Sequence, residues 1–77
     1  MNNIQKRIQK EIGPRQSGTI YKCAYWEQTC RVVAVAIDGT RWAISEVEIK
    51  ADGSETAEYV HSTAWAKGDK VISQPTA

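Results

Sequence analysis

AVAIDGTRWAISEVEIKADGSETAEYV, residues 34–60, contains the dipeptide Asp-Gly twice, at positions 38–39 and 52–53. Each copy lies between segments with the pattern of β-strands: residues 30–37, before the first copy, are nearly all apolar, as in a central strand covered on both faces. Asp-Gly between two such segments is a strong short-range signal for a β-hairpin. This stretch therefore predicts two consecutive hairpins in one antiparallel sheet.

The first hairpin is expected to turn at Asp38-Gly39, as a two-residue loop. That loop pairs Ile37 with Thr40, Val35 with Trp42, Val33 with Ile44 and Arg31 with Glu46. Apolar side chains then face each other, and opposite charges pair at the far end. A shift of one residue would turn Trp42 to the other face of the sheet, so this register is preferred.

The second hairpin is expected to have a three-residue loop, residues 51–53, with Gly53 in the left-handed conformation. This loop pairs Val47 with Ala57, Ser45 with Tyr59 and Glu46 with Glu58. A two-residue loop would instead place Val47 opposite a carboxylate. Because like charges opposite each other destabilise a sheet, we expect the two paired glutamates to be exposed.

The strand between the two turns changes its buried face midway. Its apolar positions are Trp42 and Ile44, then Val47 and Ile49, so the alternation slips by one around Ser45-Glu46. A strand with such a slip is usually bulged or strongly bent. Bends of this kind allow a small sheet to curl toward a barrel.

The remaining residues complete one domain, residues 1–77. A helix over 2–13 is predicted because Asn2 or Asn3 can cap it and Gly13-Pro14 ends it. The sheet spans 19–72, with strands over 19–26, 30–37, 55–62 and 70–72, a turn at 67–69, and a frayed tail over 73–77. We expect an α+β, mainly β fold: a short N-terminal helix and a curved antiparallel meander of about five strands. A small SH3-like or partly open barrel is the nearest shape.

The composition is that of a small globular protein. The 77 residues are 42% hydrophobic and 25% charged, close to globular averages, and they suffice for one domain. No apolar run is long enough to cross a membrane, and the start MNNIQKRIQKEI lacks the apolar core of a secretory signal. We therefore expect a cytoplasmic protein without a membrane partner.

The residue types that support metal binding and catalysis are scarce. Cys23 and Cys30 are expected to be thiols in a reducing cytoplasm, or a disulfide if the protein is exported. Together with His61 they are too few for a zinc site, which takes about four ligands. His61 is expected to be structural, and neither Ser62 nor Thr63 belongs to an evident nucleophile–base set.

Four glutamates lie on the second hairpin, and we expect them to form a solvated face rather than a catalytic pair. They are Glu46, Glu48, Glu55 and Glu58. The sequence thus predicts a protein that is not an enzyme and needs no cofactor or metal.

The aromatic residues carry the leading functional hypothesis. The chain has three Trp, three Tyr and no Phe. Trp and Tyr combine a large apolar area with a polar tip, and they are enriched at interfaces. A small core cannot enclose all of them, so four are candidate partner-binding residues: Tyr21, Tyr25, Trp26 and Trp65. They predict a non-catalytic module that occupies a surface of a protein partner, as an inhibitor, adaptor or regulator. By analogy, mobile elements such as phages encode short chains of this kind.

Two alternatives remain open. Residues 1–41 carry seven basic and three acidic side chains, whereas residues 42–77 carry three and six. This asymmetry indicates either a solvated surface or a basic face for an anionic partner such as nucleic acid. The candidate contacts are Arg15, Lys22, Arg31 and Arg41. The second alternative is a homo-oligomer, in which the helical stripe of Ile4, Ile8 and Ile12 docks on another copy instead of on its own sheet.

Overall fold

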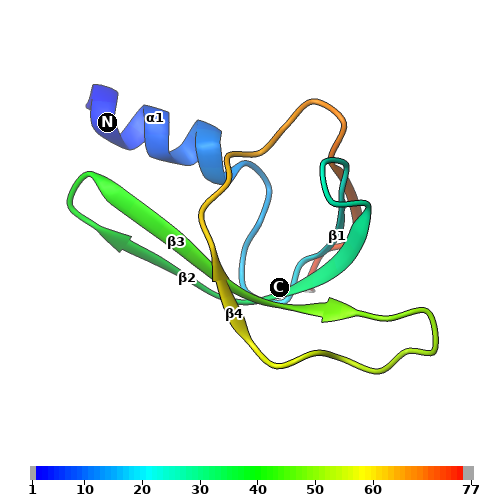
Figure 1. Ribbon diagram of the computed structural model, residues 1–77. Coiled ribbons are helices and arrows are strands. Elements are labelled where there is room, and N and C mark those ends of the chain that lie inside the picture. The colour runs from blue at the N-terminus through cyan, green and yellow to red at the C-terminus, as the bar shows by residue number, and fades with distance from the viewer. Residues whose placement is uncertain (1, 76–77) are drawn as a thin grey trace.

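Within residues 2–75, one helix precedes five strands, which form one antiparallel sheet (Figure 1). The computed structural model describes residues 2–75. Its elements are α1 (Asn3–Ile12), β1 (Ile20–Cys23), β2 (Gln28–Asp38), β3 (Arg41–Ile49), β4 (Tyr59–His61) and β5 (Lys70–Ser73). The strand order is β4-β3-β2-β1-β5, so β2 is central and β4 and β5 are the edges. The predicted fold class is confirmed, but the sheet is not closed into a barrel, and β5 returns to pair with β1.

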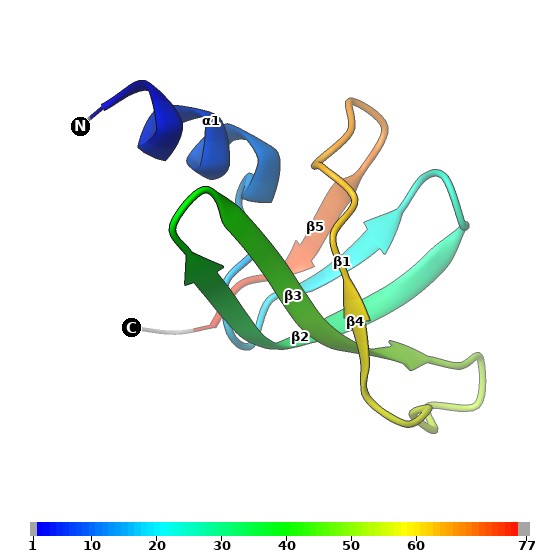
Figure 2. The same cartoon turned by 60° about the vertical axis from the view of Figure 1, so that its left-hand side comes forward.

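Helix α1 begins and ends where the sequence predicts. Asn2 caps it: the Gln5 amide donates to Asn2 Oδ1 at 2.8 Å, and the Asn2 amide donates back to Gln5 Oε1 at 3.1 Å. Gly13 ends it with φ 64°, a conformation that favours glycine. Ile8 and Ile12 are buried in the core of the same chain, and α1 lies over the turn between β2 and β3 (Figure 2).

The register of the β2–β3 hairpin differs from the prediction. The loop is Gly39-Thr40, so Asp38 pairs with Arg41, Ile37 with Trp42 and Val35 with Ile44. Gly39 has φ 63°, whereas neither Asp38 nor Thr40 has a positive φ. This is the pattern of a type II′ turn, in which only the first loop residue is left-handed. A turn on Asp38-Gly39 would force Asp38 into that conformation, so the hairpin shifts by one residue and Asp38 joins the strand.

The predicted slip in the sheet is present, but the extra residue lies in the neighbouring strand. Val32 pairs with Glu46 and Ala34 with Ser45, which leaves Val33 as a bulge in β2. The shifted turn alone would pair Arg31 with Glu48, and the bulge moves this pairing back by one residue, so Arg31 pairs with Val47 instead of the predicted Glu46. The bulge increases the local twist and bends the long β2–β3 ribbon (Figure 2).

The loop of the second hairpin is confirmed, and the pairing beyond it is not. Lys50 donates its amide to the Ser54 carbonyl at 2.7 Å, and Gly53 has φ 88°. After a single bridge between Ile49 and Glu55, the ladder breaks and resumes one residue out of phase. It then pairs Glu46 with Tyr59, Ser45 with Val60 and Ile44 with His61. The break follows from Thr56, whose hydroxyl accepts the Glu48 amide at 3.0 Å, so β4 is much shorter than the predicted strand over 55–62.

The ends of two other strands, β1 and β5, differ from the prediction. The predicted strand over 19–26 ends at Cys23, because residues 24–27 turn to start β2 at Gln28. At the C-terminus, the turn at 67–69 is confirmed, but Ser73 belongs to β5. Gln74 is also fixed, since its Oε1 accepts from Thr19 Oγ1 at 2.6 Å. Ser73 and Gln74 therefore do not belong to the expected frayed tail, and residues 76–77 lie outside the described part of the chain.

The core lies between α1 and the concave side of the sheet. Its buried members are Ile8, Ile12, Tyr21, Cys23, Cys30, Val32 and Ile44, with Val35, Trp42 and Trp65 packed against them. Both cysteines are free thiols. Within residues 2–75, no helix has the length and hydropathy needed to cross a bilayer.

Candidate functional site

Two of the four predicted partner-binding aromatics face solvent. The side chains of Tyr25 and Trp26 are 76% and 57% exposed. Tyr21 is fully buried and cannot contact a partner, which corrects the prediction for this residue. Trp65 is half-buried and packs on the Tyr21 ring with centroids 5.6 Å apart, so it covers the core. Tyr21 is buried because it lies within β1, which ends at Cys23. Tyr25 and Trp26 are exposed because they follow the end of this strand.

The exposed pair lies on a firmly held turn between β1 and β2. The Tyr25 and Trp26 rings contact each other edge to face, with centroids 4.8 Å apart. The Ala24 amide donates to Asp69 Oδ1 at 2.8 Å, which ties this turn to the one before β5. Glu27, at φ 54°, has a left-handed backbone that is uncommon for residues other than glycine. The turn therefore presents two large rings in a defined position.

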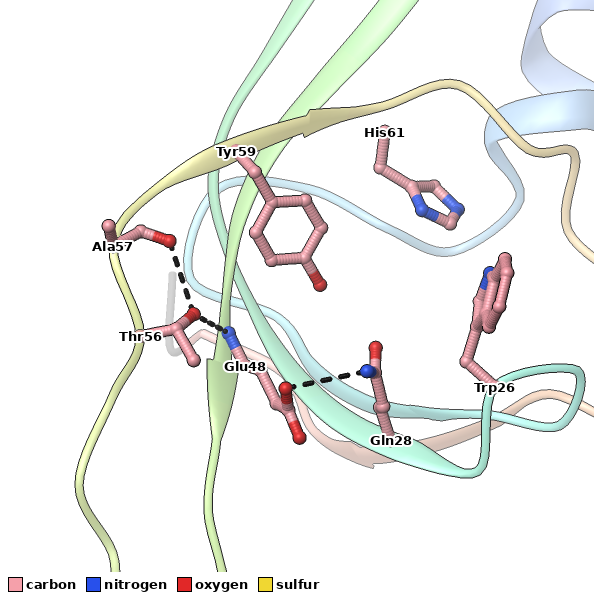
Figure 3. Close-up of a pocket in the computed structure, with 7 residues that line it drawn as sticks. All are labelled: Trp26, Gln28, Glu48, Thr56, Ala57, Tyr59 and His61. Carbon is pink, nitrogen blue, oxygen red and sulfur yellow. Dashed lines mark hydrogen bonds between the residues drawn. The ribbon is translucent and has the colours of Figure 1, made fainter.

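Beside Trp26 lies a groove with a volume of about 520 Å³ (Figure 3). Trp26 forms one side, Tyr59 of β4 stands across from it, and His61 of β4 lies at one end, nearer to Trp26. The full lining is Trp26, Gln28, Glu48, Thr56, Ala57, Tyr59 and His61. The groove is thus formed by the β1–β2 turn, the β3–β4 loop and residues of β2, β3 and β4. Aromatic side chains form its walls, and polar side chains lie at its base.

One carboxylate in this groove has few partners of its own. Gln28 Nε2 lies 3.4 Å from Glu48 Oε1, a long contact for a hydrogen bond. Among residues 2–75, the ion pair within the protein is Arg31 with Glu55, and no lysine or arginine pairs with Glu48. Glu48 is half-buried, so its negative charge is directed at the groove with little compensation.

A second carboxylate, Glu46, lies behind the Tyr59 wall. Its side chain is 1% exposed, which corrects the expectation that all four hairpin glutamates are solvated. Tyr21 donates its hydroxyl to Glu46 Oε1 at 2.6 Å, and Tyr59 donates to Oε2 at 2.7 Å. These two bonds satisfy both carboxylate oxygens, which is how a buried charge without a cation is tolerated.

The neighbours of Glu46 are held in their protonated forms. Burial raises the pKa of Tyr21 above the ordinary range, and the hydrogen bond to Glu46 adds to this. Burial likewise raises the pKa of Tyr59. Cys30 Sγ lies 3.5 Å from the Tyr59 hydroxyl, and burial raises the pKa of this thiol to about 12. The cluster is therefore a source of hydrogen bonds and not of a reactive thiolate.

The predicted basic contacts do not form one face. Arg15 is 3% exposed, which corrects its assignment as an anion contact. Its guanidinium donates to the carbonyls of Glu11, Ile12 and Thr63, and it lies within 5.6 Å of the ring centroids of three core aromatics. Arg31 forms a bidentate pair with Glu55 at 2.8 and 2.9 Å. Lys22 and Arg41 are exposed.

The isoleucine stripe is divided between the core and the surface. Ile8 and Ile12 dock on the sheet of their own chain, and Ile4 is left exposed near the start of the helix. The docking that the stripe requires is therefore made within the chain, and a second copy cannot contact Ile8 and Ile12.

The groove itself was not predicted. Trp26 was identified from its residue type, but Gln28, Glu48 and Tyr59 were not grouped with it. One signal was present: Trp42, Ile44, Glu46 and Glu48 occupy alternate positions, which places both glutamates on the face of the strand that covers the core. No local sequence pattern predicts that β4 and the β1–β2 turn lie close together on either side of the groove.

Comparisons of the chain with protein-family models, with curated proteins and with solved structures gave no match. The function is therefore argued from the site alone.

Proposed function

We propose that this protein is a non-catalytic binding module that contacts a protein partner through the Tyr25–Trp26 turn and the adjoining groove. The observation that supports this most directly is the exposure of two adjacent rings on a held turn, beside a groove of about 520 Å³. Exposed Trp and Tyr that project next to a pocket are the residue types that dominate protein interfaces. Their fixed position reduces the conformational entropy lost on binding.

The distribution of charge favours a protein over nucleic acid. A nucleic-acid site needs several cations around its stacking rings. The groove beside Trp26 instead contains Glu48, and its lining includes neither lysine nor arginine. Of the four candidate basic contacts, Arg15 is buried and Arg31 is paired with Glu55.

The experiment is affinity capture with the purified protein as bait, from lysate with and without nuclease treatment, followed by mass spectrometry. Alanine at both Tyr25 and Trp26 should reduce capture of a specific protein about thirtyfold, the effect of removing a hot-spot residue. I37A is the matched control, because Ile37 is also an exposed apolar side chain but lies near α1. Thermal denaturation verifies that both variants fold.

Two outcomes would refute the proposal. Capture that the double variant leaves unchanged would remove the turn as the contact surface. Capture that disappears on nuclease treatment would indicate that nucleic acid is the ligand.

A further inference from the structure

We infer that the groove of Figure 3 binds an arginine side chain presented by the protein partner. This inference rests on the proposed function and names the chemistry of the contact. It follows from the charge of the groove and from the nature of its walls, both of which are independent of the exposed ring of Tyr25.

The charge of the groove selects a cation. Glu48 has no ion-pair partner among residues 2–75, and its one side-chain donor, Gln28, is 3.4 Å away. Glu46 is the next residue on the same face of β3, and it adds a second negative charge behind the wall of the groove. Since neither carboxylate forms an ion pair with a lysine or arginine within residues 2–75, a cation that enters the groove gains from both.

The walls of the groove suit a planar cation. Trp26 and Tyr59 stand on opposite sides, with His61 at one end (Figure 3). Trp and Tyr ring faces attract cations, and guanidinium groups stack on them more often than ammonium groups do. The Tyr59 hydroxyl donates to the Glu46 carboxylate at 2.7 Å. That bond polarises the phenol and makes its ring a better acceptor for a cation.

Arginine fits these features better than lysine does. Its guanidinium is planar and carries a fork of donors that matches one carboxylate in two parallel hydrogen bonds. Glu48 offers that carboxylate at the base of the groove, and the stem of the side chain can lie along the Trp26 ring. A lysine ammonium would make a single point contact and remain more strongly hydrated.

The test is an NMR titration of the full chain with the peptide acetyl-Gly-Arg-Gly-amide. Matched peptides carry citrulline, the neutral analogue with the same shape, or lysine. We expect shifts at the amides of the groove residues and at the Trp26 indole. The arginine peptide should bind about threefold to fivefold more tightly than the citrulline peptide, the range for a partly exposed charge pair. The lysine peptide should fall between them.

Single substitutions distinguish the contribution of the Glu48 charge to peptide binding from that of the Trp26 ring. E48Q should remove the preference for arginine over citrulline, and W26A should weaken the arginine peptide about twofold to fivefold. E58Q is the control, because Glu58 is an exposed glutamate of the same hairpin outside the groove lining. It should bind as the native protein does.

Three results would overturn the inference: equal binding of arginine and citrulline peptides, equal or tighter binding of lysine, or no shifts at the groove residues. Any of these leaves the proposed function intact if alanine at Tyr25 and Trp26 still abolishes capture. Conversely, arginine binding without any dependence of capture on the turn would refute the proposed function alone.

Discussion

Glu46 shows how one residue can be decisive for stability and still resist prediction. Its two oxygens accept hydroxyls from Tyr21 and Tyr59, two residues that are distant in sequence. We predict that E46A lowers the free energy of unfolding by about 3 kcal/mol, because two buried hydroxyls lose their acceptor and a cavity opens. Chemical denaturation measures this loss. E48Q, two positions along the strand, should change it by no more than about 0.5 kcal/mol.

The triple substitution Y21F/E46M/Y59F provides the control, since it removes the donors together with the acceptor. It should recover much of the stability that E46A loses, because apolar groups of similar shape leave nothing unsatisfied. If E46A and E48Q cost the same, the hydrogen bonds to Glu46 contribute little.

The sequence predicts features that depend on neighbouring residues, such as helix caps and turns. It does not predict the burial of side chains that depends on residues distant in the sequence. The Asn2 cap and the left-handed Gly53 are fixed by their immediate neighbours, and both are confirmed. The basic composition of residues 1–41 predicts that Arg15 is an exposed contact for an anionic partner. Its burial results from three carbonyls and three rings that converge on it, mostly from other segments.

At the scale of elements, β5 joins the sheet at an electrostatic cost. Lys22 of β1 and Lys70 of β5 are directly opposite each other. Like charges in this position destabilise a sheet, whereas opposite charges stabilise it by about 0.2–1 kcal/mol. We predict that K70E raises the free energy of unfolding by about 0.5 kcal/mol at low salt, and that the gain shrinks in high salt. Denaturation curves at two ionic strengths test this.

K67E is the matched control, because Lys67 lies in the adjoining turn outside the β1–β5 ladder. It changes the net charge by the same amount without facing Lys22. An equal gain from K67E would assign the effect to net charge and would contradict the cross-strand explanation.

Element types were predictable from periodicity, and their registers were not. The helix, the two hairpins and the short C-terminal strand are all present. The first hairpin is shifted because glycine takes the left-handed loop position, and the second because the Thr56 hydroxyl, not its carbonyl, accepts the Glu48 amide. The first change moves the loop by one residue and each cross-strand partner by two, so the side chains keep their faces. The second moves the pairing by one residue and so exchanges the faces of the sheet. The groove exists because of the second shift, which places Tyr59 opposite Glu46.

At the scale of the whole molecule, the buried hydroxyl and thiol groups link folding to alkaline pH. Burial raises the pKa of Cys30 from its ordinary value of 9.0 to about 12, and it raises the pKa of Tyr21 and Tyr59 above their ordinary 10.0. The folded protein therefore retains protons that the unfolded chain releases. This contribution to stability is complete below pH 9 and is lost as the pH rises from about 9 toward 12.

We predict that the free energy of unfolding is nearly constant from pH 7 to about pH 8.5 and then falls, by up to about 1.4 kcal/mol per pH unit for each group that only the unfolded chain deprotonates. Urea denaturation over this range measures the slope. Y59F is less stable at pH 7, because Glu46 loses a donor, but its slope should be shallower because one of the three groups no longer titrates. Steep loss of stability already below pH 8, or equal slopes in the native protein and Y59F, would show that other groups control the alkaline transition.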